Sequence, residues 1–113
     1  MTILFVAESG PLLGSETDAL DIVGDAYGRE ATIAVVPAAR LRPEFFDLST
    51  RLAGEFVQKL VTYRIRLVIE GDITRFTEAS EPLRAFVAES NRGRHIWFVP
   101  DRLSLQDRIA TIQ

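Results

Sequence analysis

Four short apolar runs, separated by stretches with helical spacing, restrict the fold of this chain more than any other feature. The runs cover residues 3–7, 32–36, 67–69 and 95–99, are rich in Ile, Val, Phe and Trp, and have turn residues on either side. Such runs are typical of strands, and the near-continuous apolarity of the first two predicts strands covered on both faces. The order β-α-β-α-β-α-β-α predicts an α/β domain with a four-stranded, mainly parallel sheet.

Helix signals fill the gaps between the runs. The first predicted helix begins at Ser15, whose hydroxyl can accept a bond from a free N–H group while Asp18 completes a capping box, and it ends at Gly28. Its spacing predicts an inward stripe that includes Leu20 and Tyr27. Three further helices are predicted: residues 49–63, residues 81–91 behind the cap Ser80, and residues 105–112 behind the signal Ser104-x-x-Asp107. Gly54 lies inside the second helix, where glycine costs about 1 kcal/mol relative to alanine, so we expect a close approach there.

Length and composition fit one domain that spans residues 1–113. Apolar residues make up 47% and charged residues 26% of the chain, close to the averages of globular proteins, so general disorder is not expected. The absence of cysteine excludes disulfides and cysteine-bound metals and is consistent with the cytoplasm, where we place the protein. Thirteen basic and sixteen acidic residues give a net charge of −3, which argues against a protein that coats nucleic acids. The apolar start lacks a basic leader and is interrupted by Glu8, so it predicts a strand rather than a signal peptide or membrane span.

Three segments of the chain carry a family resemblance: ESGPLLGSETDALDIVGDAYG, FFDLSTRLAGEFVQKLVTYRIRLVIEGD and FVAESNRGRHIWFVPD. Together they resemble, nearly end to end, the small bacterial family called domain of unknown function 4180. The middle segment is the most specific, because helical patterning alone does not reproduce its FFDLSTRLAGEFVQK run. This resemblance implies no particular activity.

A more distant likeness concerns the fold. The strand–helix alternation, with a helix that opens on hydroxyl residues, resembles STAS-like domains, the fold of anti-sigma-factor antagonists. The Asp-Ser-Ser-Gly-type phosphorylation motif of those proteins is absent, and Leu48-Ser49-Thr50 stands in a comparable place.

Acidic side chains follow the predicted strands where those strands end. Four of them, which we call the acidic rim, would share one edge of a parallel sheet, the usual ligand position in open α/β sheets. The acidic rim consists of Glu8, Glu70, Asp72 and Asp101. Clustered carboxylates can bind Mg²⁺, but turns and helix caps also favour such residues, and no Asp-x-Asp pair or nearby lysine completes a phosphoryl-transfer site. We therefore predict no metal and no cofactor, and keep a small enzyme or ligand-binding protein that uses the rim as the competing hypothesis.

Other motifs do not form a catalytic site. The loop at residues 8–15 contains two glycines but lacks the sequence of a phosphate loop, and Ser9 has no G-x-S-x-G context. The only histidine, His95, opens a predicted strand, and one imidazole cannot build a histidine-rich metal site. We predict no catalytic residues.

Basic residues gather in the sequence near the start of the last two strands. Arg64, Arg66, Arg92, Arg94 and His95 can form a corner for an anion or an acidic partner, since arginine suits planar recognition of carboxylate or phosphate. Positive charges at a helix C-terminus and before an edge strand have ordinary structural explanations. We therefore interpret the basic corner as a structural feature rather than a binding site.

The junction before the second helix is the predicted interaction surface. It consists of Asp47, Ser49, Thr50, Arg51 and Glu55. A helix N-terminus exposes unpaired N–H groups and a partial positive charge, so a docked partner or an added phosphate can be held there. A helix cap alone is the competing explanation of the hydroxyl groups. We expect a non-catalytic regulatory or protein-interaction module that works with a protein partner or as a homodimer, and no binding to membranes or nucleic acids.

Overall fold

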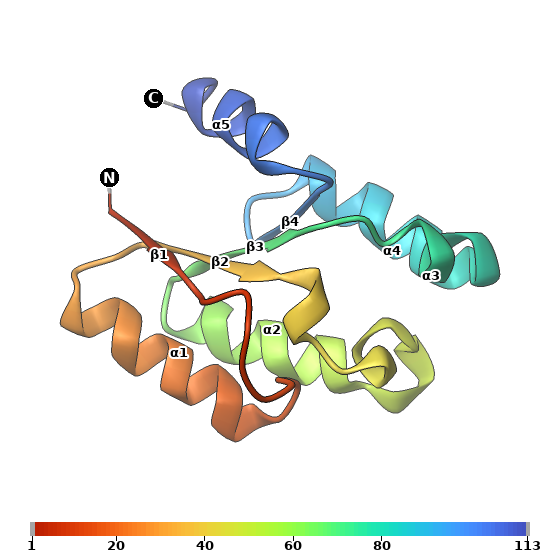
Figure 1. The fold of residues 1–113 in the computed structure, drawn as a ribbon, viewed down its shortest axis with the longest axis horizontal. Helices are drawn as coiled ribbons and strands as arrows, with labels where there is room; N and C mark the ends of the chain where they lie inside the picture. The colour runs from red at the N-terminus through yellow and green to blue at the C-terminus, as the bar shows by residue number, and fades with distance from the viewer. Residues whose placement is uncertain (1, 113) are drawn as a thin grey trace.

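The computed structural model describes residues 2–112, which contain one four-stranded sheet (Figure 1). Its strands are β1 (Ile3–Phe5), β2 (Ile33–Pro37), β3 (Arg66–Glu70) and β4 (Ile96–Val99). They lie side by side in the order β1-β2-β3-β4, and every neighbouring pair is parallel. The predicted α/β fold with a four-stranded parallel sheet is confirmed.

Helices cover the two faces of the sheet unequally (Figure 1). Helices α1 (Glu16–Gly28), α2 (Leu52–Thr62) and α4 (Glu81–Arg92) pack on one face, and α5 (Arg102–Ala110) packs on the other. Right-handed crossovers that advance one strand at a time place their helices on the same face, which accounts for the first three. The short helix α3 (Thr74–Ala79) connects β3 to α4.

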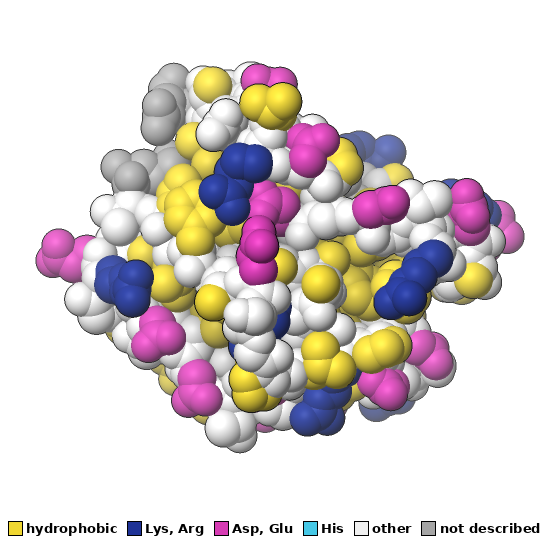
Figure 2. All heavy atoms as spheres, viewed as in Figure 1, with side chains coloured by type: hydrophobic (Ala, Val, Ile, Leu, Met, Phe, Trp, Pro, Cys, Tyr) yellow, Lys and Arg dark blue, Asp and Glu magenta, His cyan; other side chains and the backbone are white. Residues whose placement is uncertain are grey.

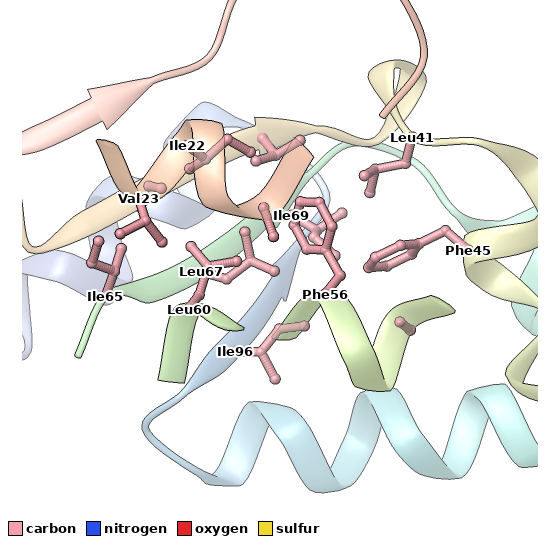
Figure 3. Close-up of a cluster of buried hydrophobic side chains, with 14 of the residues drawn as sticks. Ile22, Val23, Leu41, Phe45, Phe56, Leu60, Ile65, Leu67, Ile69 and Ile96 are labelled. Carbon is pink, nitrogen blue, oxygen red and sulfur yellow. The ribbon is translucent and has the colours of Figure 1, made fainter. Parts of the chain in front are cut away.

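Alternating strand residues divide the core into two apolar layers. The larger layer contains Phe56 and Leu60 of α2, both fully buried, and Figure 3 shows Phe56 beside Phe45, with the ring centroids 5.6 Å apart. The smaller layer lies under α5 and contains Trp97 and Leu105. Burial of each large side chain contributes about 1.5–3 kcal/mol, so the first layer provides most of the apolar stabilisation.

Local sequence signals define the starts of two helices as predicted. The Ser15 hydroxyl accepts a hydrogen bond from the Asp18 N–H at 3.1 Å, and the Asp18 carboxylate accepts one from the Ser15 N–H at 3.1 Å. This is the predicted capping box of α1. At α4 the Ser80 hydroxyl accepts a bond from the Leu83 N–H at 3.2 Å. Both caps satisfy N–H groups that have no partner within the helix.

The ends of α1 and α2 share a left-handed turn built without glycine. After α1 the N–H of Ala31 bonds the carbonyl of Ala26 at 2.7 Å, and Glu30 between them adopts φ 56. Arg64 takes the same place after α2, with φ 61. These are Schellman motifs, in which the left-handed residue is usually glycine. A side chain at such a position costs roughly 1–2 kcal/mol.

Two predicted helix starts are wrong, and one helix was not predicted. Helix α2 begins at Leu52 rather than Ser49, because Leu48–Thr50 form a 3₁₀ turn and Arg51 then adopts φ 66. Helix α5 begins at Arg102 rather than residue 105, because the carboxylate of Asp101 takes the cap position. Helix α3 has only six residues, too few for an apolar period to show in the sequence.

Two expectations about the interior are also wrong. Leu20 and Tyr27 are 42% and 56% exposed, because smaller residues of α1 already fill its contact with the sheet and α2. Gly54 is exposed, and apart from its chain neighbours and its own helix backbone no atom lies within 4 Å of where its β-carbon would be. The predicted close approach at Gly54 is therefore absent.

Candidate functional site

A cavity of about 760 Å³ lies at the carboxyl edge of the sheet. Residues at or just after the end of every strand line this carboxyl-edge cavity, among them Glu8 after β1, Pro37 in β2, Glu70 in β3 and Asp101 after β4. All four members of the predicted acidic rim belong to its lining. Figure 2 shows acidic and basic side chains close together among apolar surface on the face seen in Figure 1.

The path of the chain after β3 and β4 explains why a cavity lies here. After β3 the chain passes through α3 to α4 on one face, and after β4 it passes to α5 on the other face. Connections that leave neighbouring strands on opposite faces open a crevice at the strand ends. The fold therefore creates the hollow, and the strand-end residues determine its chemistry.

A two-bond ion pair occupies one side of the cavity. Arg102 donates from Nε to Glu70 Oε2 at 2.7 Å and from Nη2 to Oε1 at 3.1 Å. Such a bidentate pair fixes the orientation of both groups. The hydrogen bond to Glu70 raises the pKa of Arg102, and the nearby charge of Glu8 acts in the same direction. The guanidinium carbon also lies 4.4 Å from the ring centroid of Phe5, so the ion pair rests on the edge strand.

Two carboxylates of the rim cap the local backbone. Asp72 Oδ1 accepts from the Thr74 N–H at 2.9 Å and from the Thr74 hydroxyl at 2.5 Å. Asp101 Oδ1 accepts from the Ser104 N–H at 2.8 Å. The hydrogen bonds from Thr74 and Ser104 lower the pKa of Asp72 and Asp101, respectively, so both carboxylates are ionised at neutral pH. The structure thus shows the turn and cap roles expected for these two residues.

A buried arginine holds the loop that carries Glu8. Arg40 is 8% exposed and donates from Nη1 to the carbonyls of Ala7 at 2.7 Å and Ser9 at 3.0 Å. Its Nε donates to the carbonyl of Pro11 at 3.0 Å. Two of these carbonyls flank Glu8, so Arg40 fixes the backbone from which Glu8 reaches the cavity. Burial of a guanidinium is tolerated here because carbonyl oxygens accept its hydrogen bonds.

Stacked aromatic rings support the part of the cavity lining that comes from α3. The rings of Phe46 and Phe76 stack with centroids 4.4 Å apart, and the guanidinium carbon of Arg75 lies 4.4 Å from the centroid of Phe76. Phe46 is buried in the core, so it fixes α3 at this point. Arg75 and Phe76 therefore reach the cavity from a short helix that is anchored to the core.

Gly71 permits the close packing of two cavity loops. A β-carbon at this position would lie 2.9 Å from the β-carbon of Ala38, and Gly71 has φ 148. Both facts favour glycine, since side chains rarely adopt this backbone conformation. The loops after β2 and β3 can therefore approach each other at the cavity.

The carboxylates of the rim share a cavity but do not converge on one point. Within residues 2–112, no three His, Cys, Asp or Glu side chains lie close enough to hold a metal ion together. A Mg²⁺ site needs several oxygen ligands around one ion. The lining instead mixes carboxylates with Arg75 and Arg102.

The predicted interaction surface lies on an exposed turn before α2 and on the first turn of that helix. Asp47 Oδ1 accepts from the N–H and the hydroxyl of Ser49, at 3.0 and 2.7 Å, which lowers the pKa of Asp47. The Thr50 hydroxyl donates to the carbonyls of Glu44 and Asp47, at 2.8 Å each. Asp47, Ser49, Thr50, Arg51 and Glu55 are all exposed. Their use in docking stays a prediction.

The basic corner lies at the opposite, amino edge of the sheet. Arg92 forms an exposed ion pair with Glu89 at 2.7 Å. Arg66 donates from Nε to the carbonyl of Arg94 at 2.7 Å, and His95 is exposed beside it. Arg66, at the start of β3, and Arg94, just before β4, are therefore in direct contact.

Sequence reasoning missed the two arginines that line the cavity, Arg75 and Arg102, and the arginine that holds its Glu8 loop, Arg40. Arg40, Arg75 and Arg102 lie in or beside predicted turns and carry no local motif. A single signal was present for Arg102, since it follows the rim residue Asp101 directly after a strand. The roles of Arg40 and Arg75 depend on contacts with distant segments.

The open parallel sheet and its charged carboxyl-edge cavity define a small α/β domain. The chain belongs to the family described as a domain of unknown function, DUF4180, which it matches over residues 1–109. This match confirms the family resemblance of the three sequence segments. No curated protein and no solved structure matches the chain, so the likeness to STAS-like domains stays a prediction. No helix within residues 2–112 is long and apolar enough to cross a membrane.

Proposed function

We propose that this chain is a non-catalytic binding module that recognises a small organic cation in the carboxyl-edge cavity. The charge of the lining carries this proposal. The acidic rim supplies four carboxylates and Arg75 and Arg102 supply two positive charges, so the lining has a net charge of −2 at neutral pH. A cleft with an excess of one charge raises the local concentration of ligands of opposite charge.

Glu8 is the carboxylate best placed to meet a ligand. Glu70 is engaged by Arg102, while Asp72 and Asp101 each accept bonds from a neighbouring turn. Glu8 enters no ion pair within residues 2–112. It is exposed, and Arg40 holds its backbone at the cavity. A positive group therefore gains a new partner at Glu8 without breaking an existing bond.

The apolar part of the lining suits the remainder of an organic ligand. Pro37, Phe76 and Pro100 contribute apolar surface beside the charged groups. The volume of about 760 Å³ lies within the range of roughly 300–1,000 Å³ that is typical of small-molecule sites. We therefore expect a ligand that combines a cationic group with a flat or apolar body.

The chemistry of the lining favours binding over catalysis. Among the described residues that line the cavity there is no serine, cysteine, lysine or histidine, so the four carboxylates of the acidic rim are its candidates for acid–base or nucleophilic chemistry. A general acid or base works best with a pKa near the working pH. Hydrogen bonds lower the pKa of Asp72 and Asp101, which takes both groups further from neutral pH.

Thermal denaturation with a panel of small probes tests this proposal. We expect argininamide, a cation with an apolar stem, to stabilise the protein, while acetate at the same ionic strength does not. A ligand present at 100 times its Kd adds about 2.7 kcal/mol of stability. Glu8→Gln should reduce the stabilisation by argininamide. Glu44→Gln is the control, because Glu44 is exposed but does not line the cavity, and it should leave the stabilisation unchanged. Equal stabilisation of wild type and Glu8→Gln would refute the proposed site.

Calorimetry with Mg²⁺ distinguishes this proposal from the small-enzyme hypothesis. We expect no micromolar binding of Mg²⁺, because the carboxylates do not converge on one point. Micromolar binding that disappears when Glu70→Gln and Asp72→Asn are combined would instead favour a metal-dependent enzyme that uses the acidic rim.

The predicted interaction surface is a second candidate for function, and the backbone of Arg51 favours it. Arg51 is exposed and adopts φ 66 at the junction of the 3₁₀ turn and α2. A side chain held in this conformation costs free energy, as at Glu30 and Arg64, and strain of this kind can also mark a functional site. We infer that this turn docks a protein partner or a second copy of the chain.

Substitutions in the turn separate docking from capping. The capping explanation predicts that Thr50→Ala loses about 0.5–2 kcal/mol of stability, as for other caps, and that association is unchanged. The docking explanation predicts that Thr50→Glu changes self-association on a sizing column, or capture of a partner, while the Tm stays almost constant. Ser49→Ala serves as a matched variant on the same turn. Normal association of all three variants would exclude this surface.

A further inference from the structure

Two arginines meet one buried tryptophan near the amino edge of the sheet. The guanidinium carbons of Arg66 and Arg108 lie 4.4 and 4.3 Å from the ring centroid of Trp97. Arg66 comes from β3 and Arg108 from α5, so two separate elements bring positive charge to the same ring. Stacking on an aromatic ring uses the flat face of a guanidinium and leaves its in-plane N–H donors available.

The same side chains hold the turn between α4 and β4. Arg66 donates from Nε to the carbonyl of Arg94 at 2.7 Å, and Trp97 donates from Nε1 to the carbonyl of Gly93 at 2.9 Å. Arg108 donates to the carbonyl of Asn91. These bonds use one N–H of each arginine. A guanidinium has five N–H donors, so both groups retain donors beyond those that hold the turn.

Within residues 2–112, no carboxylate pairs with the positive charge at this place. Arg66, Arg94 and Arg108 enter no ion pair within residues 2–112. Arg66 and Arg108 are half-buried, and Arg94 is exposed in the turn between α4 and β4. Arg66 bonds the backbone of Arg94 and shares the Trp97 ring with Arg108; partial burial lowers the pKa of Arg66, and the charges of Arg94 and Arg108 lower it further. An anion placed among them would relieve this repulsion.

We propose that Arg66, Arg94 and Arg108 form a binding site for the phosphate group of a small molecule. Three unneutralised positive charges favour a dianion over a single carboxylate, which one guanidinium can match alone. A phosphate presents several oxygens in different directions, so it can accept bonds from three arginines at once. The site lies away from the carboxyl-edge cavity, and its ligand is independent of the cation proposed there.

Titration with inorganic phosphate at constant ionic strength tests the site. Trp97 is the only tryptophan of the chain and contacts two of the arginines, so its fluorescence serves as the signal, and calorimetry on the same samples serves as a second measurement. We expect a saturable change with phosphate and none with acetate or chloride. Arg94→Gln should weaken binding roughly tenfold, the effect of one charge-assisted hydrogen bond.

Arg92→Gln provides the matched control. Arg92 lies two residues from Arg94 and is exposed, but it forms an ion pair with Glu89. This variant should bind phosphate like the wild type. Equal responses to phosphate and chloride, equal binding by wild type and Arg94→Gln, or the absence of both heat and a fluorescence change would overturn the proposal.

Discussion

Replacement of Arg40 by methionine should destabilise the protein by roughly 2–3 kcal/mol. The change removes three hydrogen bonds to the carbonyls of Ala7, Ser9 and Pro11 while keeping most of the side-chain volume. A hydrogen bond to a charged group contributes about 1.5–3 kcal/mol, so the three bonds together set an upper limit well above the loss that we expect. Two effects reduce the loss: water can reach the exposed loop, and methionine avoids the cost of burying a charge. The Tm of a domain of this size should fall by roughly 10 °C.

Urea unfolding followed by the fluorescence of Trp97 measures this loss. The m-value should stay constant, because the surface exposed on unfolding is nearly the same. Amide exchange should accelerate at Leu13 and Arg42, whose N–H groups bond the carbonyls of Arg40 and Leu13. The exposed Arg29→Met is the matched control and should change stability by less than about 0.5 kcal/mol. An equally small effect of Arg40→Met would show that the loop does not depend on this arginine.

Four further predictions concern the backbone and one carboxylate. Gly54→Ala should raise the free energy of unfolding by about 0.5–1 kcal/mol, because the position is exposed and unobstructed within a helix. Gly71→Ala should lower the free energy of unfolding, because the new β-carbon would lie 2.9 Å from that of Ala38. Urea unfolding measures the sign of the change for both variants. Arg64→Gly should raise the Tm, since glycine removes the cost of φ 61, about 1 kcal/mol, and an unchanged or lower Tm would contradict this. Burial raises the pKa of Asp18, but hydrogen bonds from the start of α1 outweigh it, so the folded pKa is below 3.8 and the unfolded chain binds protons more tightly. The stability that this ionised carboxylate contributes is present above pH 3.8 and disappears as the pH falls through the folded pKa. On acidification the wild type should therefore lose more stability than Asp18→Asn, which has no such carboxylate. Urea titrations at pH values from about 7 to about 2 measure this difference.

Local chemistry accounts for the features that the sequence predicted well. The capping box at Ser15 and the cap at Ser80 depend on residues within one turn, so no distant contact can displace them. The strands were recognisable because both faces of a parallel sheet are covered and the runs are almost wholly apolar. Parallel pairing then brings the strand ends together, which is why Glu8, Glu70 and Asp101 line one cavity as expected.

Competition between signals explains the helix starts that the sequence misplaced. Asp101 and Ser104 can both cap a helix, and the path of the chain out of β4 gives the position to Asp101. Ser49 has the composition of a cap, but it is drawn into a 3₁₀ turn by the carboxylate of Asp47. In both places, two residues with similar propensities lie within a few positions, and only tertiary structure selects one.

Long-range contacts explain what the sequence did not predict about the site. Arg40 bonds carbonyls that lie 29 to 33 positions away in the chain. Arg102 pairs with Glu70 across 32 positions. No local pattern marks such partners, because their distance in the sequence depends on how the loops are arranged. Arginine can be recognised as charged from the sequence, but its partner cannot.

The strand order has a consequence for synthesis of the chain. Each strand pairs with the one that precedes it, so a nascent chain can add every new strand to an edge that is already complete. The paired residues lie 29 to 33 positions apart, the separation that one crossover helix between parallel strands requires. Within residues 2–112, the nine residues of α5 cover the second face of the sheet, and they follow all four strands in the chain. Until α5 has been made and has packed, the apolar side chains of this face, Trp97 among them, are open to water.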